Sequence, residues 1–313
     1  MLNRRTFINK TALAAGSVLV GAQMSKAASL FAPTTSLTIL HTNDVHSRID
    51  AFPMDGGQYE GLGGVAARAA LINSIRKTEK NVLLLDAGDI FQGTPYFNIY
   101  KGEPELKAMT AMGYDGGTIG NHDFDAGIEN LAMQVSRHAR FPILIANYDF
   151  SGTPMENKYA PYKIIKKEGL KIGLFGLGIE LKGLVAENLY GATQYSDPVQ
   201  TANTIAGQLK EKGCDLIICL SHLGYQYKNE KISDVVLAKE TNFIDLILGG
   251  HTHTFLNNPV SVTNKMGKEV LVNQVGYAGT VRLVCLKYQA FASRHASSIS
   301  FFIFSFKGSL PKT

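Results

Sequence analysis

Apolar and polar positions alternate regularly from Leu37 onward, with short apolar runs followed by longer stretches whose apolar residues recur every three or four positions. The short runs predict buried strands, and the longer stretches predict amphipathic helices. Their alternation is typical of an α/β fold with buried, largely parallel strands. The predicted strands are 37–41, 82–86, 142–146, 172–175, 216–220, 244–248, 270–274 and 281–286. The predicted helices are 65–77, 104–112, 128–137, 198–212 and 233–240.

Polar clusters follow five of the apolar runs, just where each predicted strand ends. In chain order they read T-N-D-V-H, A-G-D, G-N-H-D-F-D, S-H-L-G and G-G-H-T-H, the third of them after Thr118-Ile119. Open α/β sheets gather their ligand sites at the carboxyl ends of strands, so these clusters can converge. A lone His is more often structural and a lone Gly-Asp is usually a turn. Five such clusters, all rich in Asp, Asn and His, are not explained as turns.

The residue types in these clusters point to bound metal. Asp, Asn and His without Cys suit Zn²⁺, Mn²⁺ or Fe rather than a thiolate-zinc structural site. Two such cations placed about 3.5–4 Å apart need a bridging carboxylate. Asp89 is the natural bridge, because it leaves a buried strand on a tight turn at Gly88.

The remaining ligand candidates are spaced to present donors to one face. Asp44 and His46 stand two apart in a segment predicted to be extended, and His251 and His253 repeat that spacing in another loop. Asn121 supplies a neutral oxygen, which keeps the site positive enough to hold a phosphate.

Composition and charge exclude some classes of function. Hydrophobic residues make up 45% and charged residues 18% of the 313 residues, a balance typical of a folded globular protein. The net charge is +5, but residues 1–32 carry +4 and residues 290–313 carry +3, which leaves −2 for the body. Such a body lacks the basic surface of a nucleic-acid-binding protein. The odd cysteine count, with Cys214 and Cys219 in apolar surroundings, predicts buried core residues rather than disulfides.

Residues 1–28 have the pattern of an export signal. A basic start containing Arg4-Arg5 precedes a short apolar run and small residues, which resembles a twin-arginine signal. The run is shorter than the roughly 18 residues that span a bilayer, so no stable membrane anchor is expected. We therefore expect a periplasmic or extracellular protein. The alternative is an amphipathic first helix of the mature domain.

The motifs taken together resemble a known family. D-V-H, G-D, G-N-H-D, S-H and G-H-T-H, in this order, resemble the calcineurin-like metallophosphoesterases. The longer strings H-T-N-D-V-H-S, D-A-G-D-I-F-Q-G-T-P and G-G-H-T-H-T-F-L narrow the resemblance to the 5′-nucleotidase family, which includes UDP-sugar hydrolases and 2′,3′-cyclic phosphodiesterases. It covers residues 36–288, which are expected to form one metallophosphoesterase domain. The fold implied is a four-layer α/β/β/α sandwich with two mixed β-sheets.

The resemblance also implies a dinuclear site and its chemistry. It implies that one metal is held by Asp44, His46, Asp89 and His253, that the other is held by Asp89, Asn121, His222 and His251, and that His122 and Asp125 form a catalytic dyad. The expected reaction is hydrolysis of a small phosphate ester, such as a nucleotide, by a hydroxide between two divalent ions. Asp125 orients His122 in this interpretation. The alternative for Asp125 is a helix N-cap before residues 126–137.

The end of the chain departs from that family. The C-terminal substrate domain of full-length 5′-nucleotidases has no counterpart here, and residues 289–313 form an atypical tail without acidic residues. We hypothesise a truncated or frameshifted end, or a substrate domain supplied by a separate polypeptide. Two other interpretations stay open: a thiosulfohydrolase-like enzyme of sulfur oxidation, and a metal-loaded but inactive binding module.

Overall fold

The computed structural model describes residues 35–229, 231–279, 284–290 and 304–305. Its contacts divide the chain into two units, and the second, Leu37–Lys287 with Phe302–Thr313, contains all the predicted site residues. The predicted signal, 1–28, lies outside the described residues, as does most of the predicted tail, 289–313. Within the described part, no helix is long and apolar enough to cross a membrane.

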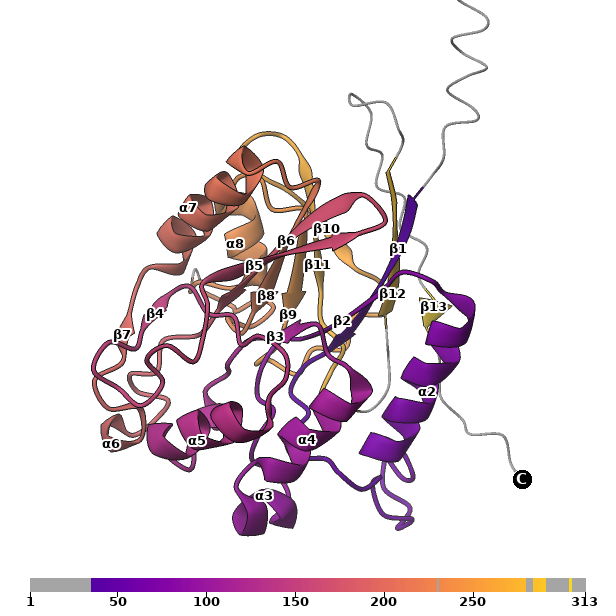
Figure 1. The fold of residues 1–313 in the computed structure, drawn as a ribbon, viewed down its shortest axis with the longest axis vertical. Coiled ribbons are helices and arrows are strands. Elements are labelled where there is room, and N and C mark those ends of the chain that lie inside the picture. The colour runs from indigo at the N-terminus through magenta and orange to yellow at the C-terminus, as the bar shows by residue number, and fades with distance from the viewer. Residues whose placement is uncertain (1–34, 230, 280–283, 291–303, 306–313) are drawn as a thin grey trace, which may run out of the picture. The chain divides into compact units, whose positions relative to one another are not determined.

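Helices and strands alternate along the described chain (Figure 1). The strands are β1 (Thr35–Thr42), β2 (Val82–Asp86), β3 (Gly116–Gly117), β4 (Tyr148–Asp149), β5 (Tyr162–Lys167), β6 (Leu170–Leu177), β7 (Gln194–Tyr195), β8 (Leu216–Ser221), β9 (Leu246–Gly249), β10 (Val260–Thr263), β11 (Glu269–Asn273), β12 (Val284–Ala290) and β13 (Phe304–Ser305). The helices are α2 (Val65–Thr78), α3 (Pro95–Tyr100), α4 (Glu103–Met112), η1 (His122–Phe124, a 3-10 turn), α5 (Ile128–His138), α6 (Glu187–Tyr190), α7 (Pro198–Glu211) and α8 (Asp234–Glu240).

The strands form two larger sheets, and both sheets are mixed. The first has the order β13-β12-β1-β2-β3, in which β1, β2 and β3 run parallel and β12 and β13 antiparallel. The second has the order β10-β11-β9-β8-β6-β5, in which the four central strands are parallel and the two edge strands antiparallel. A small third sheet pairs β4 with β7.

Alternation along the strands explains how the layers stack. Leu84 of β2 belongs to a hydrophobic cluster with α2, α4 and α5, and Cys219 of β8 belongs to a second cluster with α7 and α8. Their neighbours Leu85 and Leu220 are equally buried but belong to neither cluster, because successive side chains point to opposite faces of a strand. Each sheet therefore has helices on one face and the other sheet on its other face. The four-layer α/β/β/α arrangement is confirmed.

Most predicted elements are confirmed, including all five helices and the strands that precede four of the five polar clusters, with small shifts at their ends. Two strand predictions are wrong. The third cluster follows β3 at Gly116–Gly117 rather than a strand at 118–119, and residues 142–146 form only isolated bridges. That segment crosses between the sheets: the Leu144 amide donates to Gly117 of the first sheet, and the Ala146 amide donates to Gly176 of the second.

Two edge strands were not predicted from the sequence. The edge strands β5 and β10 are only partly buried, so their sequences lack a continuous apolar run. The prediction for Cys214 and Cys219 is confirmed, since both are buried and free. The side chain of Cys285 lies outside the described residues.

Candidate metal centre

The loops that follow β1, β2, β3, β8 and β9 bring the seven predicted ligands together. Two groups of side chains each place their potential ligand atoms within 4.8 Å of one another. The groups are Asp44, His46 and His253, called here the outer cluster, and Asp89, His222 and His251, called the inner cluster. Asn121 extends the inner cluster, because its Oδ1 lies 2.9 Å from Nδ1 of His251.

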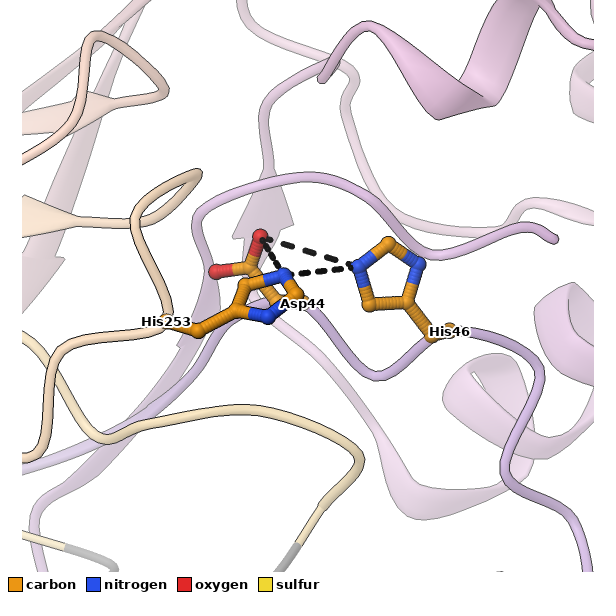
Figure 2. A group of neighbouring side chains, drawn as sticks. All are labelled: Asp44, His46 and His253. Atoms are coloured by element: carbon orange, nitrogen blue, oxygen red, sulfur yellow. Dashed lines mark hydrogen bonds and ion pairs between the residues drawn. The ribbon is translucent and has the colours of Figure 1, made fainter. Parts of the chain in front are cut away.

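The outer cluster joins the loop after β1 to the loop after β9 (Figure 2). Nε2 of His46 and Nε2 of His253 are 3.0 Å apart. Oδ1 of Asp44 lies 3.4 Å from Nε2 of His253 and 4.0 Å from Nε2 of His46. Asp44 is fully buried, whereas the His253 side chain is 40% exposed. The three donors thus converge on one point that is open on the His253 side.

Asp89 faces both clusters. Its Oδ2 lies 3.0 Å from Nε2 of His222 in the inner cluster and 3.8 Å from Nε2 of His46 in the outer one. The tight turn predicted at Gly88 exists: Gly88 has φ +87°, and a Cβ there would stand 2.7 Å from the amide nitrogen of Gly120. Asp89 thus lies within 4 Å of a histidine in each cluster.

The predicted extended geometry of the two i, i+2 pairs is wrong. Asp44, His46, Asp89, His251 and His253 all have left-handed backbones, with φ of 49°, 50°, 54°, 73° and 52°. Each non-glycine residue in a sparsely populated region costs about 1–3 kcal/mol and persists only where its surroundings hold it. His251 and His253 belong to different clusters, whereas Asp44 and His46 belong to the same one. Five of the seven candidate ligands thus have strained backbones.

Hydrogen bonds orient these donors from behind. Nδ1 of the buried His222 lies 2.6 Å from the carbonyl oxygen of Ala87, which leaves Nε2 directed at Asp89. The His251 amide donates to both carboxylate oxygens of Asp44, at 3.0 Å each. This contact ties the loop after β9 to the loop after β1.

His122 and Asp125 form a pair at the rim of the centre. Nδ1 of His122 lies 2.9 Å from Oδ2 of Asp125, and the His122 side chain is 40% exposed. The hydrogen bond to Asp125 raises the pKa of His122. The ring of His122 lies edge-on to His46, with 5.3 Å between centroids. The alternative of Asp125 as a helix N-cap is wrong, because α5 has Gly127 at its N-cap and no side-chain capping bond.

Comparison with known families identifies the family of this chain. Residues 37–255, more than half of the chain, match the family described as calcineurin-like phosphoesterase. The chain belongs to this family. Membership implies bound divalent metal ions, in agreement with the two clusters.

Relatives of this calcineurin-like chain include nucleotidases. It is 37% identical to a snake venom 5′-nucleotidase of Gloydius brevicauda over 281 residues, covering 84% of this chain and 46% of the relative. It resembles the crystal structure of a 5′-nucleotidase precursor from Thermus thermophilus, with 34% identity and a TM-score of 0.73 over 81% of this chain and 51% of that one. The chain thus spans less than half the length of the curated relative.

A more distant neighbour shares the calcineurin-like fold but carries another chemistry in its name. A sulfate thiohydrolase from the genus Thermus is 20% identical, with a TM-score of 0.66 over 80% of this chain and 53% of that one. Similarity at this level of identity shows the fold alone.

The chemistry of the calcineurin-like centre fits a divalent cation. Burial disfavours the charged form of His222, yet the adjacent Asp89 and Asp44 carboxylates raise the pKa of His222 to about 10. Burial likewise disfavours ionised Asp89, but His222 and His46 hold the pKa of Asp89 below its ordinary range. The buried carboxylates thus require nearby positive charge. A divalent cation supplies that charge, and nitrogen and oxygen donors suit Zn²⁺, Mn²⁺ or Fe.

Sequence reasoning missed three buried polar residues that support the ligands. Asn43 contacts Asp44 through its side-chain amide and accepts a hydrogen bond from Val275 at 3.0 Å. Gln274 bonds the loop that carries His251 and His253, through Gly250 and Thr254. Asp123 accepts hydrogen bonds from the loop after β2. Asp123 stands inside G-N-H-D-F-D and could have been noticed there, whereas Asn43 and Gln274 carry no local signal.

Proposed function

We propose that this chain hydrolyses phosphate esters of nucleotides with two divalent metal ions. One observation carries the proposal: the buried carboxylate Asp89 lies between two clusters of nitrogen and oxygen donors, within 4 Å of a histidine in each. Two ions that share a ligand about 3.5–4 Å apart are typical of phosphoester hydrolysis. Family membership supports the same reaction class.

Each ion has a defined set of ligands in this proposal. Asp44, His46, Asp89 and His253 hold the first ion, and Asp89, Asn121, His222 and His251 hold the second. The ions are Zn²⁺, Mn²⁺ or Fe, because the donor set suits all three. When bound, they polarise the phosphoryl group and lower the pKa of water.

The protein residues orient the substrate and move a proton. Asn121, a neutral donor beside the inner cluster, would contact a phosphoryl oxygen without adding negative charge. Nδ1 of His122 donates a hydrogen bond to Asp125, so Nε2 of His122 is available to act on the substrate. The raised pKa of His122 favours the charged imidazole, which stabilises negative charge on the phosphoryl oxygens or protonates the leaving group.

The substrate class is inferred from the relatives. Two of them are named as 5′-nucleotidases, which favours 5′-nucleotides, with 2′,3′-cyclic nucleotides as a second group of substrates. From the basic, small-residue start of the chain we also infer export by a twin-arginine signal.

An assay of the purified chain tests the function directly. The chain is loaded with Mn²⁺ or Zn²⁺, its metal content is measured, and it is incubated with p-nitrophenyl phosphate, bis-p-nitrophenyl phosphate and AMP. We expect turnover of at least one ester and loss of turnover after chelation. Protein that holds two ions per chain but hydrolyses no ester would support an inactive binding module instead.

A further inference from the structure

Asp123 is a buried carboxylate in the middle of the centre whose position suggests a role beyond folding. Its side chain is 2% exposed and lies between the loop after β2 and the loop after β3. Its two oxygens accept four backbone hydrogen bonds. Oδ2 accepts from Asp89 at 3.1 Å and Gly120 at 2.8 Å, and Oδ1 accepts from Ile90 at 2.9 Å and Phe91 at 3.0 Å.

Three of these amides belong to the turn that carries the shared ligand. Asp89 has φ +54° and follows Gly88, which has φ +87°. The chain has left β2 at this point, so its buried amides need acceptors other than the sheet. Asp123 supplies those acceptors to three consecutive residues. It therefore holds Asp89 in a left-handed conformation that would otherwise be unfavourable.

The fourth amide connects this turn to the other loop. Gly120 immediately precedes Asn121 and His122, and the His122 amide donates to Oδ1 of Asp89 at 2.8 Å. The loops approach so closely that a Cβ on Gly120 would stand 2.1 Å from Oδ1 of Asp89. One carboxylate, Asp123, thus sets the spacing between the shared ligand and the Asn121–His122 pair.

We propose that Asp123 is a positioning residue that sets the geometry of the inner cluster and thereby its affinity for the second ion. The inference deepens the proposed function and rests on its assignment of Asp89 and Asn121 as ligands. Asp123 itself points at backbone amides and contributes no ligand atom. Residues that orient metal ligands typically change metal affinity about 10- to 100-fold when replaced.

An isosteric substitution separates this role from simple packing. In Asp123→Asn the size is unchanged, but an NH₂ group must face either the amides of Asp89 and Gly120 or those of Ile90 and Phe91. One pair of backbone amides then faces an N–H donor instead of an acceptor oxygen. Asp245→Asn is the matched control, because Oδ2 of Asp245 also accepts a backbone hydrogen bond, from the Ile217 amide at 2.8 Å. Asp245 lies where β9 begins, at the end of the sheet opposite to the metal centre.

The experiment measures Mn²⁺ binding to the full chain by titration calorimetry, without substrate, together with thermal unfolding. We expect Asp123→Asn to weaken the second ion at least about tenfold, and Asp245→Asn to change it less than about twofold, even if both lower the unfolding temperature. Asp123→Glu keeps the charge but displaces both oxygens. We expect it to weaken that ion at least threefold, and it decides the question if Asp123→Asn does not fold.

The outcomes are distinct. Folded Asp123 variants that bind both ions like the wild type would overturn the inference. Weakening by the Asp245 control as large as that by Asp123→Asn would also overturn it. Wild-type protein that binds two ions but hydrolyses no ester would overturn the proposed function alone, while the binding data still test Asp123.

Discussion

The two halves of the metal centre are built differently. In the inner cluster, His222 and Asp89 are at most 1% exposed, and their positions depend on backbone groups: the carbonyl of Ala87 and the loop amides bound by Asp123. In the outer cluster, His253 is 40% exposed, and its ring stacks on Tyr277 at 4.9 Å and 9° between planes. Buried hydrogen bonds to backbone hold the inner cluster, whereas the outer cluster combines the buried, hydrogen-bonded Asp44 with the exposed, ring-stacked His253.

This difference in construction predicts that the two clusters hold their ions with unequal strength. Buried hydrogen bonds to backbone allow little movement, because an unpaired buried group is costly. Ring stacking at a partly exposed site tolerates small displacements, because stacked rings stay in contact over a range of offsets. We therefore expect the inner cluster to bind its ion more firmly and the outer cluster to exchange its ion more readily.

Replacing Asp89, the proposed shared ligand, should weaken ion binding at both clusters. In Asp89→Ala both sites lose a carboxylate, so we expect neither ion to be retained after dialysis and kcat/KM for an ester to fall roughly 10³-fold or more. Metal content by mass spectrometry and steady-state rates check this. Circular dichroism serves as the folding control. Retention of two tightly bound ions would contradict a shared role for Asp89.

Replacing His122 should leave both halves intact and still remove activity. Because His122 carries no ligand role in our assignment, His122→Ala should keep both ions while kcat falls about 10²- to 10⁴-fold. The measurement pairs metal content with steady-state rates at saturating ester. Asp125→Asn should lower kcat by less, since it disturbs only the orientation of the ring. If His122→Ala lost an ion, the dyad and the metal centre could not be treated as separate.

A chelator should remove the ions from the two clusters at different rates. On exposure of Mn²⁺-loaded protein to excess EDTA, we expect two phases of ion release, the slower at least about tenfold slower than the faster, since burial restricts access to the inner cluster. Stopped-flow metal-indicator absorbance measures both phases. Asp123→Asn should accelerate the slow phase more than the fast one. A single phase for two ions would contradict unequal halves.

Removing the stacked ring should have the smallest effect. Tyr277→Leu keeps apolar bulk but loses the ring beneath His253, and stacking contributes about 0.5–1.5 kcal/mol, so we expect roughly 2- to 10-fold weaker binding of the outer ion. Phe52→Leu is the control, because Phe52 contacts Tyr59 in the same aromatic group rather than His253. Equal effects of the two substitutions would indicate a general loss of packing.

Much of the site could be predicted because strand ends are visible in a single sequence. Apolar runs such as 82–86 and 216–220 are continuous where both faces of a strand are buried, so the polar residues after them mark the edge where loops meet. The edge strands β5 and β10 lack that signal, because one side of each is exposed. Residues 142–146 look like a strand but bond to both sheets in turn.

The sequence by itself determined which donors are available and in what order: carboxylates, an amide and imidazoles at the ends of buried strands. Only the tertiary structure shows which contacts hold these donors in two clusters. His251 and His253 stand two apart yet belong to different clusters, whereas Asp44 and His46, with the same spacing and equally left-handed backbones, belong to one. Such backbones persist because partners distant in the chain hold them, as the Asp44 carboxylate holds the His251 amide. Contacts of that kind exist only once the loops have met, so no local pattern can encode them.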